Sequence, residues 1–187
     1  MSTKKRLYQS LILPILTYCS PVWRPNLLTD ICNLERVQKR ATRYIVNDPS
    51  LNYRERLCKL QMLPLMFQLE LADILFTVSS IKNPNNHFNI LQSLTFSSSN
   101  TRSNSQFKLK HNYSSNNRSR HSFFNRIPRL WNSLPIIDPS LPINTIKKSI
   151  IAHLIEHFMS HFDSDRACTY HYLCPCNLCA LTPGLHF

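Results

Sequence analysis

The sequence predicts a mainly α-helical protein, with a small helical bundle, a flexible Ser/Asn-rich basic segment, a second helical segment and a short Cys/His tail. Apolar residues recur at helical spacing in several segments, and 43% of the 187 residues are hydrophobic, which is enough to build a core. Gly184 is the one glycine of the chain, whereas turn-rich all-β folds and phosphate-binding loops both require several glycines. Proline and asparagine mark the connections between the apolar segments, which is typical of helices joined by turns.

The first expected helix is apolar almost all round, with Leu7, Leu11, Ile15 and Tyr18 at helical spacing. A helix without a polar face is typical of a buried element, so we expect this one to lie in the core. Pro14 lies inside it and is expected to kink the helix or end it early, because proline lacks the N–H that a helix interior needs.

Residues 31–47 are the most informative segment of the chain. At about 100° per residue, one narrow helix face carries four cations, Arg36, Lys39, Arg40 and Arg43, which we call the basic ridge. The opposite face carries Ile31, Leu34, Val37, Ala41, Tyr44 and Ile45, which predicts that it packs against the core. Thr29 or Asp30 can cap this helix, and Asp48-Pro49 is expected to end it. The basic ridge suits a phosphate backbone, although in an isolated helix such a face is more often simply solvated.

Two further helices follow in the same half of the chain. Asn52 and Glu55 stand three residues apart, which is the spacing of a capping box at the start of a short helix over residues 53–59. A long helix over residues 65–81 has one polar stripe, formed by Glu70, Asp73 and Thr77, and is otherwise apolar. We expect this long helix to be the central packing element.

The composition divides the chain into four parts. Residues 1–92 form the helical bundle, and residues 93–122, rich in Ser and Asn, form a flexible basic linker with a short strand near Phe107 and Leu109. Residues 123–162 form the second helical segment, in which Pro128 limits the first helix and residues 143–162 form the last one. Residues 163–187 form the Cys/His tail.

The chain is strongly basic, with a formal net charge of +12. No Asp or Glu occurs between Ile74 and Ile137, whereas Lys and Arg are scattered through this span. Such a stretch attracts polyanions, of which nucleic acid is the commoner and an anionic membrane surface the second. We therefore expect nucleic acid as the partner, and no membrane.

Four blocks of the sequence, in this order, carry a family resemblance. They are Leu7–Leu11 with Tyr18–Trp23, Leu34–Arg43, Asn52–Leu57 with Leu63-Pro64, and Phe124–Pro135. Each block is short, and the four in order are specific. Together they resemble the C-terminal part of the reverse transcriptase of non-LTR, LINE-type (jockey-like) retrotransposons, from about residue 4 to residue 155.

The resemblance implies a thumb-like helical unit that follows the polymerase palm and grips template and primer beside an RNA-directed DNA polymerase core. It implies that the basic ridge contacts the nucleic-acid backbone, that Arg126 and Arg129 form a second contact surface, and that the palm is the protein partner in an intact family member. Reverse transcription needs paired aspartates that hold two metal ions, and this chain has no Asp-Asp. We therefore expect no enzyme activity from this chain.

The tail contains five candidate metal ligands within twelve residues. Thiolate and imidazole are zinc ligands, and four of them suffice for a tetrahedral site. The predicted set is Cys168, His171, Cys174 and Cys179, with Cys176 left over, and zinc is the one cofactor that we expect. Exposed thiols on a poorly ordered tail are the alternative. Cys19, Cys32 and Cys58 lie among apolar neighbours and are expected to be buried thiols.

The sequence thus favours a non-catalytic remnant of a retrotransposon reverse transcriptase that binds a template–primer-like duplex through its backbone, without sequence specificity. One alternative is a zinc-stabilised protein-interaction module. Another is a decayed reading frame without selected function, which exposes the surface that its palm once covered. We expect an intracellular protein, and the basic run from Lys4 to Arg6 is compatible with a nuclear location.

Overall fold

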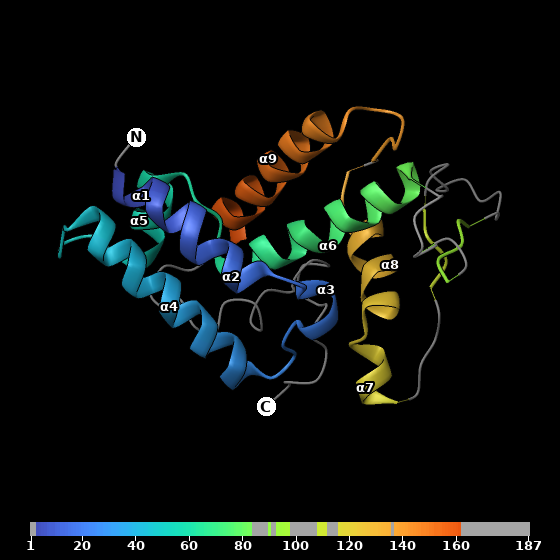
Figure 1. Cartoon of the computed structure of the whole chain (residues 1–187), viewed down its shortest axis with the longest axis horizontal. Helices are drawn as coiled ribbons and strands as arrows, with labels where there is room; N and C mark the ends of the chain where they lie inside the picture. The colour runs from blue at the N-terminus through green and yellow to red at the C-terminus, as the bar shows by residue number, and fades with distance from the viewer. Residues whose placement is uncertain are drawn as a thin grey trace.

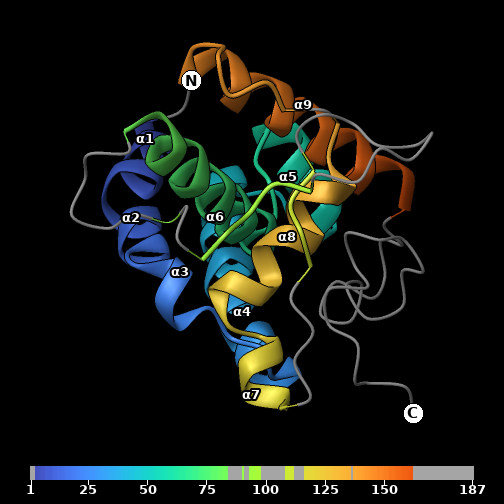
Figure 2. The same ribbon diagram turned by 90° about the vertical axis from the view of Figure 1, so that its right-hand side faces the viewer.

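The computed structural model describes residues 3–83, 90, 93–97, 108–111, 116–135 and 137–161. They contain α1 (Thr3–Leu7), the π-helical turn η1 (Tyr8–Ile12), α2 (Leu13–Thr17), α3 (Ser20–Trp23), α4 (Leu28–Val46), α5 (Tyr53–Leu60), α6 (Leu65–Lys82), α7 (Asn117–Arg120), α8 (Phe123–Ser133) and α9 (Ile143–His161). Helix α6 crosses the middle of the molecule, with α9 on one side of it and α4 on the other (Figures 1 and 2). The predicted mainly helical fold class is confirmed for these residues.

One hydrophobic core runs through the N-terminal bundle and the C-terminal helices. Helix α6 contributes Phe67 and Ile74, α8 contributes Leu130, and α9 contributes Leu154 and Phe158, all of them buried. The rings of Phe67 and Phe158 pack edge to face, with their centroids 6.3 Å apart. The predicted parts 1–92 and 123–162 therefore share a core, and α6 is the central packing element, as its apolar composition predicts.

The sequence predicts the bounds of α5, α6 and α9 to within one residue. Helix α5 begins with the predicted capping box: the Asn52 side chain accepts from the Glu55 backbone N–H at 2.9 Å, and the Glu55 carboxylate accepts from the Asn52 N–H at 2.8 Å. Helices α6 and α9 begin at the predicted residues and end within one residue of the predicted ends. Helix α4 ends at Val46, where Asn47 takes a left-handed conformation with φ of 52°, but no side chain caps its N-terminus at Leu27.

The prediction that the first helix is buried is wrong. Of the residues of α1, η1 and α2, only Tyr8 is buried, whereas Leu11 is 61% exposed and Ile15 is 75% exposed. This helix lies on the outside of the bundle, beside α4 and over one end of α6 (Figure 1). One face is thus covered, and the remaining apolar side chains point into solvent.

The two prolines inside helical segments do not end them. Before Pro14, the Leu13 N–H bonds to the Tyr8 carbonyl in the π-helical turn, so Pro14 falls in the first turn of α2, where its missing N–H removes nothing. Helix α8 continues past Pro128 to Ser133. The buried neighbours Ile127 and Leu130 offset the one backbone hydrogen bond that Pro128 removes. The prediction that Pro128 limits this helix is wrong.

Parts of the predicted linker pack against the bundle. Leu94 and Leu109 are buried, and Leu109 forms an isolated antiparallel bridge with Phe96. The Asn132 side chain accepts from the Leu109 N–H and donates to the Leu109 carbonyl, both at 2.9 Å. The short strand expected near Leu109 is thus a single bridge, and Phe107 lies outside the described residues.

Within the described ranges, no single helix is both long enough and apolar enough to cross a membrane. Helices α5 and α6 pass such a test only as a pair, and they bend by 46° at their junction. Helix α6 also contributes Phe67, Leu71, Ile74 and Val78 to the buried core.

Candidate nucleic-acid interface

Helix α4 is held in place by a stripe of mixed polarity. The buried residues recur at Ile31, Glu35, Gln38, Thr42 and Ile45, which is the face opposite the basic ridge. The predicted apolar face is therefore rotated: Val37 is 41% exposed and Tyr44 is 69% exposed. The physical reason is that Glu35 and Gln38 both find hydrogen-bond partners inside the bundle, so burying them costs little.

Gln38 joins α4 to η1 and to the segment before α6. The Tyr8 hydroxyl donates to Gln38 Oε1 at 3.1 Å, and Gln38 Nε2 donates to the Leu63 carbonyl at 2.7 Å. Burial, together with the nearby Glu35 carboxylate, raises the pKa of Tyr8 well above its usual value, so the phenol stays protonated and donating.

Glu35 caps α6 from a neighbouring helix. The Leu65 N–H, at the first position of α6, donates to both carboxylate oxygens of Glu35, at 3.1 and 3.2 Å. The Tyr53 hydroxyl donates to the same carboxylate. Pro64 occupies the N-cap position and has no side-chain acceptor, so Glu35 supplies the missing cap. Burial raises the pKa of Glu35 to about 7, although these hydrogen bonds oppose that rise.

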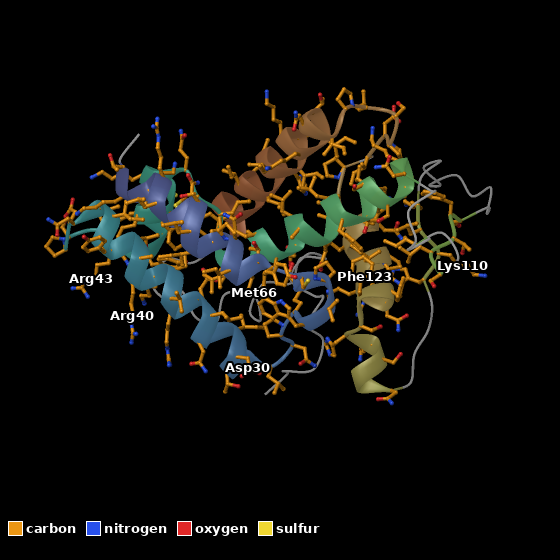
Figure 3. The ribbon with its side chains drawn as sticks, viewed as in Figure 1. Asp30, Arg40, Arg43, Met66, Lys110 and Phe123 are labelled. Carbon is orange, nitrogen blue, oxygen red and sulfur yellow. The ribbon has the colours of Figure 1, made fainter. Side chains whose placement is uncertain are left out.

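These buried contacts leave the basic ridge facing solvent. Arg36, Lys39, Arg40 and Arg43 are all exposed, and Figure 3 shows Arg40 and Arg43 extending outward from α4. Arg36 donates to the Asn33 side chain at 3.0 Å. Among the residues that the structure describes, no carboxylate lies within ion-pair distance of these four cations. At 1.5 Å per residue, the ridge extends over roughly 10 Å.

Arg126 does not form the second contact surface that the resemblance implies. Its side chain is buried, and its Nε lies 2.9 Å from Asp73 Oδ2. Its Nη1 and Nη2 donate to the carbonyls of His121, at 2.8 Å, and Pro21, at 3.2 Å. Each of the three nitrogens of this buried guanidinium thus already donates to the protein itself, which indicates a structural role.

Arg129 is half-buried and also turns toward its own chain. Its Nε donates to the Asn125 carbonyl at 3.2 Å, and its Nη2 donates to the Arg120 carbonyl at 2.7 Å. Helix α8 and the C-terminal end of α4 lie at opposite ends of the molecule (Figure 1). The structure therefore does not bring Arg126 or Arg129 to the basic ridge.

Sequence reasoning missed a buried cluster of four charges between α3, α6 and α8. Arg24 donates to Glu70 at 2.7 Å and to Asp73 at 3.1 Å, and Arg126 reaches the same Asp73 oxygen. Burial raises the pKa of Glu70, and the charge of Arg24 opposes that rise. The signal was present: two carboxylates on an otherwise apolar core helix require buried cations as partners.

A second feature missed at the sequence level is an exposed apolar surface formed by α1, η1, α2, α3 and the following turn. It consists of Leu7, Leu11, Ile12, Ile15, Tyr18, Val22, Trp23 and Leu27, which we call the N-terminal apolar surface. Val22 is 88% exposed. Eight large apolar side chains exposed within residues 7–27 suit the binding of another macromolecule.

The predicted zinc ligands Cys168, His171, Cys174 and Cys179 lie outside the described residues. Within the part of the chain that is described, no group of three or more His, Cys, Asp or Glu side chains is arranged to hold a metal. Cys19 and Cys58 are exposed and Cys32 is half-buried, so the expectation of three buried thiols is wrong.

In comparisons with known proteins, no protein-family model, no curated protein and no solved structure matches the chain.

Proposed function

We propose that this chain binds nucleic-acid backbone through the basic ridge, without sequence specificity and without catalysis, as a remnant of a non-LTR retrotransposon reverse transcriptase. The observation that carries the proposal is the ridge itself: four exposed cations on one face of a helix whose other face is fixed by buried hydrogen bonds. Cations held at helical spacing suit phosphates, which are recognised by charge and position.

The charge balance around α4 supports this proposal. Glu35, which lies next to Arg36 in the sequence, points inward to Leu65 and Tyr53 and so does not neutralise the ridge. Arg43 also lies close enough to Arg56 on α5 to lower the pKa of Arg56, after the larger effect of burial. A surface on which cations repel one another gains from a polyanion that neutralises them.

The meeting of the resemblance blocks in space supports the proposed origin. Tyr8 of the first block contacts Gln38 of the second, and Gln38 contacts Leu63 of the third. Arg126 of the fourth block donates to Pro21 of the first. Blocks that are far apart in the sequence therefore belong to one folded unit, which is expected if they descend from one domain.

The direct test is fluorescence-anisotropy binding of the purified chain to a primer–template duplex across a salt series. We expect a Kd in the micromolar range or below. A plot of log Kd against the logarithm of the salt concentration should have a slope that corresponds to the release of several counterions. Binding that is absent, or that does not change with salt, while circular dichroism shows folded helix, would contradict the proposal.

The N-terminal apolar surface supports a second candidate function, the docking of another polypeptide. In an intact family member this polypeptide is the polymerase palm.

Native protein is expected to bind the dye 1-anilinonaphthalene-8-sulfonate at this surface, because exposed apolar side chains such as Ile15 and Val22 are available to it. The variant with Leu11→Ser, Ile15→Ser and Val22→Ser together should lose dye binding and keep duplex binding. Unchanged dye binding would argue against an accessible docking surface.

A further inference from the structure

An exposed aromatic ring lies at the C-terminal end of the basic ridge. Tyr44 keeps 69% of its surface exposed, although it belongs to a helix that is packed against the core. The Lys4 ammonium from α1 lies over its ring, 4.3 Å from the centroid. Helix α1 runs beside the C-terminal end of α4 (Figure 1), so the fold brings together a cation and an aromatic that are forty positions apart in the sequence.

The ring also lies next to a ridge cation. Arg40 and Tyr44 are four residues apart on α4, so they are neighbours on its surface, with about 5–6 Å between their Cβ atoms. Tyr44 is therefore flanked by Arg40 on its own helix and by Lys4 from α1. An exposed ring with one cation over it and another one helical turn away matches what an unpaired nucleotide presents, because the base has a flat π-face and the phosphates on either side of it are anionic.

We infer that Tyr44, together with Lys4 and Arg40, forms a base-stacking site that takes an unpaired nucleotide of single-stranded nucleic acid. The inference rests on the proposed function, and it adds a contact to a base to the contacts with the backbone. A duplex keeps its bases stacked and offers none of their faces to Tyr44. A single strand offers one, and stacking of one base on an aromatic is worth about 1–3 kcal/mol.

The experiment compares two probes that carry equal phosphate charge. One is fluorescein-labelled oligothymidylate of about 12 nucleotides, and the other is an oligomer of the same length in which abasic sites replace the bases. Wild-type protein is expected to bind oligothymidylate roughly tenfold more tightly. Tyr44→Ala should remove this preference while keeping the affinity for the abasic probe, and Tyr44→Phe should retain the preference.

Tyr18→Ala is the matched control, because Tyr18 is 75% exposed and lies outside the basic ridge. It should leave the preference unchanged. Equal binding of both probes by wild-type protein, or an equal loss on both in Tyr44→Ala, would overturn the stacking site and leave backbone binding in place. If neither probe nor the duplex binds, the proposed function fails and the inference fails with it.

Discussion

The Nε of Arg126 on α8 lies 2.9 Å from Oδ2 of Asp73 on α6, and Arg24 reaches the same oxygen at 3.1 Å. Asp73 is fully buried. These contacts tie the fourth resemblance block to the core helix and to the segment that precedes α4. The pair is therefore expected to matter for stability and not for nucleic-acid binding.

Removal of the Arg126 side chain should strongly destabilise the fold. Breaking a buried ion pair by removing one partner typically costs about 3–5 kcal/mol. We expect the lower end of that range for Arg126→Ala, because Asp73 keeps Arg24 as a partner. Urea-induced unfolding followed by circular dichroism measures the difference in the free energy of unfolding.

Arg129→Ala serves as the control for this experiment. Arg129 lies on the same helix and is half-buried, and its two hydrogen bonds go to backbone carbonyls. Its loss should cost no more than about 1 kcal/mol. If the two variants are equally stable, the buried cluster does not stabilise the fold in the way described.

The positions of the helices were more predictable from the sequence than the faces that they bury. Helix α5 has a capping box and α6 is almost wholly apolar, and both signals are local, so the bounds could be predicted closely. The orientation of α4 could not, because periodicity counts Glu35 and Gln38 as solvent-facing residues. Their partners, Leu65 and Tyr8, come from other elements, and no pattern within α4 indicates them.

The candidate site was partly predictable for the same reason. The exposure of the ridge cations follows from the helical spacing of residues 36–43, and that spacing is local. The burial of Arg126 depends on Asp73, 53 positions away, and the contact between Lys4 and Tyr44 joins two helices. The excess of positive charge in the sequence predicts a basic surface. It does not indicate which cations form ion pairs inside the core instead.

Glu35 should make the stability of the fold fall as pH rises toward neutrality. Burial raises the pKa of Glu35 to about 7, above the usual 4.5 of a glutamate. Between these two pH values the folded state holds a proton that the unfolded state has lost. Each rise of one pH unit therefore lowers the free energy of unfolding by on the order of 1 kcal/mol. This contribution is complete below about pH 4.5 and is lost as pH passes through about 7.

Glu35→Gln isolates that contribution. The amide oxygen can still accept from Leu65 and Tyr53, and the side chain no longer titrates. The free energy of unfolding, measured from pH 5 to pH 8 for both proteins, should fall more steeply in wild type than in the variant. Parallel curves would show that Glu35 does not ionise in this range.

The tail should bind one zinc ion per chain if the predicted ligand set is right. Thiolates and imidazole must lose their protons to bind, so the metal should leave at low pH or with a chelator. Purified protein should yield one equivalent of zinc in a colorimetric release assay, and Cys168→Ser with Cys174→Ser should abolish it. Cys19→Ser is the control, since Cys19 lies on the helical unit. Wild-type protein without zinc would leave the thiol tail as the alternative.

The central claim is that the basic ridge, and not the net charge, binds nucleic acid. Two triple variants test it, because each removes three positive charges. One combines Arg36→Gln, Arg40→Gln and Arg43→Gln. The other combines Lys110→Gln, Lys147→Gln and Lys148→Gln, which are exposed and lie outside α4. Figure 3 shows Lys110 at the opposite end of the molecule from Arg43.

The deciding measurement is the salt dependence of duplex binding for wild type and both variants. Each lost phosphate contact lowers the slope of log Kd against log salt by about 0.9. The ridge variant should therefore lower the slope by nearly 3, while the lysine variant lowers it by less than about 1. Equal losses in the two variants would mean that binding follows net charge alone, and would contradict the assignment of the basic ridge.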